Sequence, residues 1–239
     1  MSESTHAAGA RFPTTHLSFL DLAGRPEAPE FRAAWEAFFR AYWRPMYAWL
    51  RRTGSPTEEA SDLVQDLFLE GLQSDLLRGY DRARGSLRGY LKGCLRHRRL
   101  RLRDQEGARP DRLPLPFLDA KEVEACLADA SARDPEATFE EEWARQVLAS
   151  AIAEVERTLA DLGDSLSLRL LREWVLALDR PPAQTLAEGL GISPGDLWTR
   201  ATRLRHRLLQ EVETQVRACS PGAAPVGEEV DEVLRCLTM

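Results

Sequence analysis

The sequence has no run of about 18 or more apolar residues, so no segment is long and apolar enough to cross a bilayer as a helix. Residues 1–11 are polar and lack the apolar stretch of a secretion signal. We therefore expect a cytoplasmic protein without a membrane partner.

Cysteine and histidine are few and scattered. A structural zinc site needs closely spaced pairs of ligands, and the sequence has no C-x-x-C pair and no cysteine grouped with histidines. It also lacks a nucleophile motif, a P-loop and a glycine-rich phosphate loop. We therefore predict no metal site, no cofactor and no enzymatic activity. The residues concerned are Cys94, Cys126, Cys219, Cys236, His6, His16, His97 and His206.

Lysine is nearly absent, since Lys92 and Lys121 are the only two among 32 basic residues. The net charge of −6 argues at first against a nucleic-acid partner, but the charges are segregated along the chain. Residues 78–103 hold ten basic residues and one acid, whereas residues 104–146 hold twelve acids and five basic residues. The field at a binding surface depends on nearby charges, so the basic segment can still bind nucleic acid. We hypothesise that residues 106–142 partly screen it.

Helical periodicity recurs along the chain, and alternating β-branched segments are missing, which predicts an all-α protein with two helical domains. The predicted division is an N-terminal extension (1–28), a first domain (29–105), a flexible acidic linker (106–137), a second domain (138–217) and a tail (218–239). The linker includes a short helix near residues 120–129. The tail carries Val230, Val233, Leu234 and Leu237 at helical spacing, which would either dock on the second domain as a regulatory segment or add to the core.

Residues 184–208 have the pattern of two short helices joined by a tight turn. Gly191 can end the first helix in a left-handed conformation, and Ser193 can cap the second, with Pro194 at its first position. The second helix has one narrow apolar face, formed by Leu197, Ala201, Leu204 and Leu208. This is the pattern of a DNA-binding helix-turn-helix.

The polar side of that second helix and its flanks supply candidate contacts to duplex DNA. Arg203 could bind a guanine edge, while Arg200 and Arg205 suit phosphates. The alternative is an ordinary helix hairpin with a solvated basic face. The candidate residues are Trp198, Thr199, Arg200, Thr202, Arg203, Arg205, His206 and Arg207.

A helix is predicted over residues 57–73, after a break at residues 54–56. One face is apolar, and another carries Asp62, Gln65, Asp66 and Leu69 at positions i, i+3, i+4 and i+7. This acceptor-lined face could receive arginine side chains from a partner helix, with the leucine as an apolar anchor. The alternative is a solvated face with one exposed leucine.

Residues 80–103 combine a dense positive charge with two tyrosines. A cationic groove with aromatic rings is what a single-stranded nucleic acid requires, since the groove holds the backbone and the bases stack on the rings. The alternative places the tyrosines in the core and pairs the cations with the acidic linker. The candidate residues are Tyr80, Arg84, Arg88, Tyr90, Lys92, Arg96, His97 and Arg99.

The three segments, in this order and separated by an acidic linker, resemble the extracytoplasmic-function sigma factors of the sigma-70 family. The residues that carry the resemblance are SDLVQDLFLEGL, GSLRGYLKGCLRHR and TLAEGLGISPGDLWTRATRLRHRL. The resemblance implies that Asp62, Gln65 and Asp66 contact the β′ coiled coil of core RNA polymerase. It further implies that the second segment melts the −10 promoter element and that the third reads the −35 element.

The sequence departs from this family at Leu87, His97, Trp198 and Thr202, where other residues are common. These departures bear on which promoter is read and on strand opening. An anti-sigma factor or other control protein is a further candidate partner. Two alternatives remain open: a helix-turn-helix regulator that does not engage polymerase, and a degenerate sigma relative that acts as a protein-interaction module.

Overall fold

The computed structural model describes residues 22, 27–72, 76–77, 79–104, 134–219 and 226–238. Every regular element in these ranges is a helix, as the periodicity predicted. No helix in them combines the length and the apolar character needed to cross a membrane. The elements are α2 (Phe31–Arg52), α3 (Thr57–Leu72), a 3-10 turn (Arg82–Arg84), α4 (Leu87–Asp104), α6 (Pro135–Asp161), α7 (Ser165–Leu170), a π-helical turn (Leu171–Val175), α8 (Ala183–Leu190), α9 (Pro194–Cys219) and α10 (Val226–Thr238).

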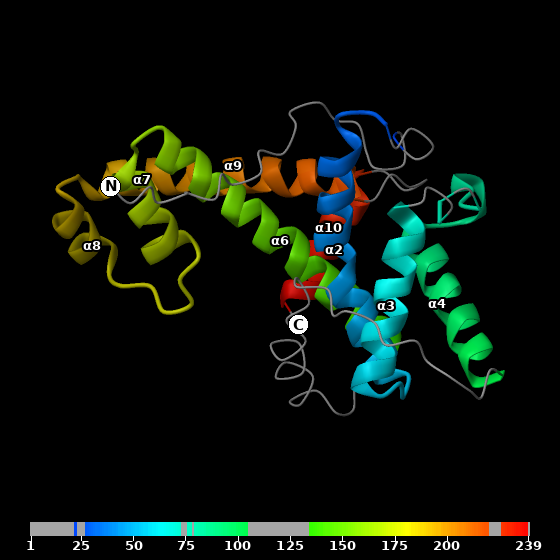
Figure 1. The fold of residues 1–239 in the computed structure, drawn as a ribbon. Coiled ribbons are helices and arrows are strands. Elements are labelled where there is room, and N and C mark those ends of the chain that lie inside the picture. The colour runs from blue at the N-terminus through cyan, green and yellow to red at the C-terminus, as the bar shows by residue number, and fades with distance from the viewer. Residues whose placement is uncertain are drawn as a thin grey trace, which may run out of the picture.

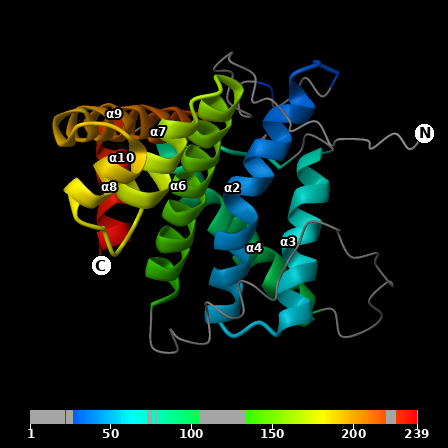
Figure 2. The same cartoon turned by 90° about the vertical axis from the view of Figure 1, so that its left-hand side faces the viewer.

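Helix α2 is the centre of the first core and lies between α6 and α3 (Figure 2). It is exceptionally rich in aromatic residues, most of which are buried because other helices cover it on several sides. Phe38 and Trp35 both meet Phe68 of α3 edge-on, with ring centroids 5.8 and 5.5 Å apart. The helix ends before Gly54, whose φ of +92° favours glycine. Its buried aromatic residues are Phe31, Trp35, Phe38, Tyr42, Trp43, Tyr47 and Trp49.

Helix α3 packs on α2 on the side away from α6, and α4 packs against both α3 and α2 (Figure 2). The apolar face predicted for residues 57–73 is buried as expected, and α3 ends at Leu72. In α4, Leu87, Leu91 and Leu95 are buried at positions i, i+4 and i+8. Leu87, at a position where the family often has an aromatic residue, is therefore a core residue here.

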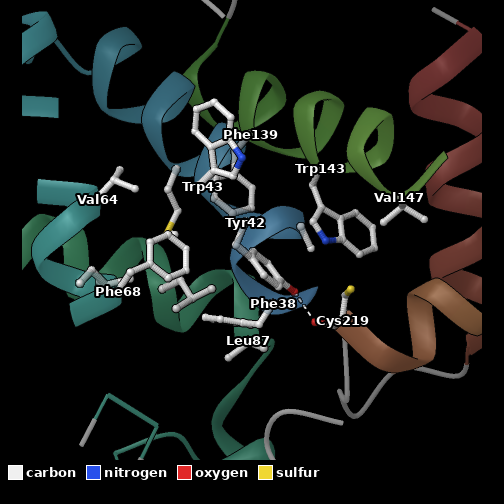
Figure 3. Close-up of a cluster of buried hydrophobic side chains, with 14 of the residues drawn as sticks. Phe38, Tyr42, Trp43, Val64, Phe68, Leu87, Phe139, Trp143, Val147 and Cys219 are labelled. Atoms are coloured by element: carbon white, nitrogen blue, oxygen red, sulfur yellow. Dashed lines mark hydrogen bonds between the residues drawn. The ribbon is translucent and has the colours of Figure 1, made fainter. Parts of the chain in front are cut away.

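Two long helices, α6 and α9, run between the two ends of the molecule, with α3 and α4 at one end and α7 and α8 at the other (Figure 1). The first half of α6 packs on α2 through Phe139, Trp143 and Val147 (Figure 3). Its second half enters a separate core through Val155 and Leu159. The second core is completed by Leu170, Leu171, Trp174, Leu186, Ala187, Leu197, Ala201 and Leu204.

The first core continues across the boundary that the sequence predicted between residues 29–105 and residues 138–217. Helix α6 begins at Pro135, inside the predicted linker, and Asp134 caps it by accepting a hydrogen bond of 3.3 Å from the Ala137 backbone N–H. Residues 106–133, including the short helix predicted near 120–129, lie outside the described residues. One core therefore joins segments on both sides of the linker.

The end of α9 is tied to the first core by a buried hydrogen bond. The Tyr42 hydroxyl donates to the backbone carbonyl of Cys219 at 2.5 Å (Figure 3). Helix α10 packs against α6 and α9, where Val230 and Val233 are buried in the first core. The sequence predicted that the tail either docks on the second domain as a regulatory segment or adds to the core. In the structure these two valines are core residues.

Candidate nucleic-acid interface

The turn between α8 and α9 has the geometry that the sequence predicted. Gly191 adopts φ +68° and ψ +30°, and the Ile192 N–H returns to the Ala187 carbonyl at 3.0 Å. The Asp196 N–H donates to Ser193 Oγ at 3.1 Å, and the Ser193 hydroxyl donates to the Asp196 carboxylate at 2.8 Å. These bonds satisfy backbone groups at the start of α9 and fix the angle at which it leaves the turn.

The predicted DNA-facing side of α9 is exposed. Leu197, Ala201 and Leu204 are buried in the second core, which turns the opposite side of the helix outward. Trp198, Thr199, Thr202, Arg203 and His206 are exposed, and Arg200, Arg205 and Arg207 are half-buried.

Backbone and side-chain hydrogen bonds from Ser167 lower the pKa of the Asp164 carboxyl, and the charges of Arg200 and Arg207, which lie near it, help to lower it. Thr199 and Thr202 donate to the helix carbonyls four residues earlier. His206 shares a hydrogen bond with Gln210 at 3.0 Å. The α9 face is thus a positive surface on which Arg203 is exposed and Arg200 and Arg207 lie near acidic side chains.

The predicted polymerase-facing side of α3 is only partly exposed. Leu69 is 45% exposed, and Asp62 and Asp66 are half-exposed beside it. Gln65 is only 7% exposed, so its amide is not part of the accessible surface. The structure thus brings two carboxylates and one leucine together on α3 and corrects the placement of the glutamine.

Tyr80 and Tyr90 lie side by side at the start of α4, with ring centroids 5.5 Å apart. The Tyr90 hydroxyl donates to the Leu76 carbonyl at 2.7 Å, and the Tyr80 hydroxyl donates to the Gly85 carbonyl at 3.2 Å. Burial raises the pKa of Tyr90 to about 12, with a smaller contribution from Cys94, so the phenol stays protonated as a donor. The sequence left open whether these tyrosines are exposed for base stacking or buried in the core. Both rings are half-buried, which is intermediate between the two.

A hollow of about 380 Å³ opens next to these rings, and Arg84 stands exposed at its edge. Its floor needs glycine, because a Cβ on Gly79 would lie 2.8 Å from the Tyr90 hydroxyl oxygen, and Gly85 has φ +144°. The hollow therefore combines aromatic walls with a cation in a space large enough for a planar ring system. Its lining residues are Gly79, Tyr80, Asp81, Arg84, Gly85, Ser86, Gly89 and Tyr90.

The cations of α4 that face α6 are paired with acidic side chains. We call Arg88, Lys92 and Arg96 the cation row, since they follow one another at helical spacing on one side of α4. Arg88 Nε lies 3.2 Å from Glu140 Oε2, and Arg96 donates to Glu136 at 2.8 Å. Lys92 Nζ bonds both carboxylates, at 3.3 Å for Glu140 and in closer contact with Glu136.

Aromatic rings complete the enclosure of the cation row. The Arg88 guanidinium carbon is 4.1 Å from the ring centroid of Trp143, and Lys92 Nζ is 4.9 Å from that of Phe139. Arg88 and Lys92 are consequently buried, with side chains only 8% and 11% exposed. The sequence pattern placed both among residues that bind single-stranded DNA, yet in this structure α6 covers most of each side chain.

The other predicted residues of α4 differ in exposure. His97 is exposed, and Arg99 donates to the Thr53 carbonyl at 2.9 Å. Between α3 and α4 lies a cleft of about 410 Å³, lined by Asp66, Glu70, Tyr90, His97, Arg98 and Arg101 among others. Arg98 pairs with Glu70 across it. Within the described ranges no three His, Cys, Asp or Glu side chains are grouped closely enough to hold a metal ion.

Sequence reasoning gave Glu136 and Glu140 no individual role, although it proposed that residues 106–142 screen the basic segment. Burial alone would raise the pKa of Glu136, but hydrogen bonds from Lys92 and Trp49 and the charges of Lys92 and Arg96 lower it below its ordinary value. The available signal was the spacing of Phe139, Trp143 and Val147 at i, i+4 and i+8, which marks an apolar helix face beginning directly after the predicted linker.

Comparison with known protein families identifies the segment that contains α3, the tyrosine pair and α4. Residues 38–109 match the family model of sigma-70 region 2. The sigma-70 region 2 segment covers less than a third of the chain and ends before α6. It supports a sigma-70 family member and, with it, a role in polymerase binding and transcription initiation. Searches of curated proteins and of solved structures found no significant match.

Proposed function

We propose that this chain is a sigma factor of the extracytoplasmic-function type, which binds core RNA polymerase, recognises promoter −35 and −10 elements and promotes transcription initiation. The sigma-70 region 2 match within the same chain as the capped α8–α9 unit carries this proposal. The polymerase performs the chemistry, so the factor is not an enzyme. It works in the cytoplasm, where polymerase and DNA are found.

The α3 surface supports docking on the polymerase β′ coiled coil. Asp62 and Asp66 lie one turn apart and can pair with arginines of a partner helix. Leu69 adds an exposed apolar anchor one turn further along the helix. Because Gln65 is buried, we assign it to orienting α3 rather than to direct contact.

The hollow beside Tyr80 and Tyr90 supports binding of the opened −10 strand. A base that leaves the duplex can stack on an aromatic wall, and such stacking contributes about 1–3 kcal/mol per base. Arg84 is placed to hold a phosphate at the edge of the hollow. His97 is a further candidate on the exposed side of α4. Arg96 is another, because 58% of its side chain stays exposed although it pairs with Glu136.

The α9 surface supports reading of the −35 duplex. A helix with a capped start and one buried face can enter the major groove with its outer side toward the bases. Arg203 and Thr202 are central on that side, whereas Arg200, Arg205 and Arg207 lie toward its flanks and suit phosphates.

The test is in vitro transcription and core-polymerase pull-down with the pair Asp62→Ala, Asp66→Ala. We expect the pair to lose polymerase binding and promoter-dependent transcription. The control is Glu228→Ala, Asp231→Ala, which removes two exposed acids from α10 and changes the net charge equally. If the α3 pair binds polymerase as well as the parent, the docking assignment is wrong.

One observation favours the alternative of a protein-interaction module. Arg88 and Lys92, two of the cations assigned to the opened strand, are buried against α6. A chain of that kind would leave no specific footprint on any promoter in the presence of polymerase. A DNase footprint on promoters selected from a genomic library therefore separates the two functions. An anti-sigma factor or other control protein stays a candidate partner.

A further inference from the structure

We infer that the first turns of α6 form an autoinhibitory clamp whose carboxylates occupy the cation row of α4 in place of nucleic-acid phosphates. We call Glu136, Phe139, Glu140 and Trp143 the α6 clamp. The inference rests on the proposed function for the identity of the displaced ligand. It concerns how access to the −10 surface is regulated.

The first argument is the match of charge and spacing. Three cations at positions i, i+4 and i+8 of α4 meet two carboxylates at positions i and i+4 of α6. Lys92 lies in the middle and bonds both. A row of cations that repeats along a helix suits a row of phosphates equally well, because carboxylate and phosphate oxygens accept the same hydrogen bonds.

The second argument is that α6, and not α4 itself, buries Arg88 and Lys92 of the cation row. Arg88 and Lys92 owe their burial to Trp143 and Phe139, whose rings lie over their charges. Once α6 moves away, both cations lose their contacts with its carboxylates and rings. A cation cannot stay buried without an opposite charge, so the exposed row becomes a phosphate site.

The third argument is that the helix carrying the α6 clamp also carries the second core. Helix α6 meets the cation row near Glu136 and Glu140, and it meets the second core at Val155 and Leu159. These contact points are about 19 residues apart, which is roughly 30 Å of α-helix. The α9 surface is built on that second core.

Uncovering the cation row requires α6 to leave α2 and α4. Because α9 and α10 pack on α6, they move with it. The same movement breaks the Tyr42–Cys219 hydrogen bond and uncovers the cation row. Release of the clamp is thus coupled to a displacement of α9, which carries the proposed −35 surface.

The test measures binding of the full chain to a fluorescein-labelled single-stranded oligonucleotide of mixed sequence, about 20 nucleotides long. The variant is Glu136→Gln, Glu140→Gln, which keeps the side-chain shapes and removes the two clamp charges. The control is Glu154→Gln, Asp161→Asn, which removes two acids that pair with Arg157 on the same helix, away from α4. Both variants change the net charge equally.

We expect the clamp variant to bind the oligonucleotide about tenfold more tightly and the control to stay near the parent. The slope of log affinity against log salt should steepen by about 2, because three more cations each contribute about 0.7. Hydrogen exchange of residues 135–147 should quicken in the clamp variant alone. If the double variant unfolds, Glu136→Gln alone should give the same changes at smaller size, since this side chain is 43% exposed.

Equal oligonucleotide affinity and salt slope in a folded clamp variant and the control would overturn the clamp. That result leaves the proposed function intact if the parent still transcribes with core polymerase. If the parent neither binds polymerase nor footprints a promoter, the proposed function fails instead. The oligonucleotide measurement uses no polymerase, so the two failures are distinguishable.

Discussion

Trp174 meets the exposed ring of Trp198 edge-on, with ring centroids 5.7 Å apart and an interplanar angle of 90°. Trp174 is 5% exposed in the second core, whereas Trp198 is 52% exposed on the outer side of α9. A buried ring thus supports an aromatic side chain at the surface predicted to face DNA. Trp198 stands where the resembling family usually has a basic residue, so we expect a stacking contact or a thymine-methyl contact in place of a charge.

The tryptophan pair predicts coupling in both stability and binding. Trp174→Leu, Trp198→Ala and the double variant should give a coupling energy of about 0.5–1.5 kcal/mol in denaturant unfolding. Trp174→Leu should also weaken duplex binding severalfold although it does not touch DNA, because Trp198 loses its support. Unchanged duplex binding by a folded Trp174→Leu protein would show that Trp198 is positioned by α9 alone.

Arg203 and Arg205 should separate base reading from phosphate binding. Arg203→Ala should cost about 1–3 kcal/mol on the selected −35 sequence and relax the preference at one base pair. Arg205→Ala should weaken all sequences alike and reduce the salt slope by about 1. Competition binding against a set of single-base variants checks both. If Arg205→Ala instead relaxes the base preference and Arg203→Ala weakens all sequences alike, Arg205 reads the base and Arg203 binds the phosphate.

Tyr42→Phe should destabilise the joined core. It removes the donor to the buried Cys219 carbonyl and should lower the free energy of unfolding by about 1–3 kcal/mol. Tyr80→Phe is the matched control, because its hydroxyl bonds a carbonyl at an exposed site and its loss should cost much less. Denaturant unfolding of the three proteins measures the difference. If the parent and Tyr42→Phe are equally stable, the Tyr42–Cys219 hydrogen bond does not contribute to holding α9 against α2.

Glu136 predicts a dependence of the closed arrangement on acid pH. Its pKa is lower in the folded chain than in the unfolded one, where it is about 4.3, so its stabilising effect is complete at neutral pH. That effect should fade as the pH drops below about 5 and the carboxylate gains a proton. Lys92 and Arg96 of α4 and Trp49 of α2 face this carboxylate, and Arg99 and Asp134 line the same cavity.

The measurement is the unfolding free energy of the parent and of Glu136→Gln between about pH 3 and pH 7. The difference between the two proteins should be largest at neutral pH and shrink toward the acid end. Asp161→Asn, on an exposed site of the same helix, is the control for a general effect of charge. A difference that does not change with pH would mean that the lowered pKa has another origin.

Local signals in the sequence were sufficient for the all-α fold class, for α3 and for the α8–α9 turn. Gly191, Ser193 and the spacing of Leu197 predicted a turn and a capped helix, because caps and left-handed glycines act over three or four residues. The apolar face of α3 was predictable for the same reason, since a helix repeats every 3.6 residues wherever it stands. Exposure of Trp198 and Arg203 followed directly from the opposite, buried face.

The tertiary structure alone decided which cations are available. Arg88 and Arg203 look alike in the sequence, yet the first lies under Trp143 and pairs with Glu140, while the second is exposed. Periodicity fixes the face of a helix on which a residue lies, but not what covers that face. The covering helix, α6, comes from beyond the linker, and its place depends on long-range burial of Phe139 and Trp143 against α2. Such burial depends on the shapes and apolar areas of both surfaces together, which no local pattern encodes.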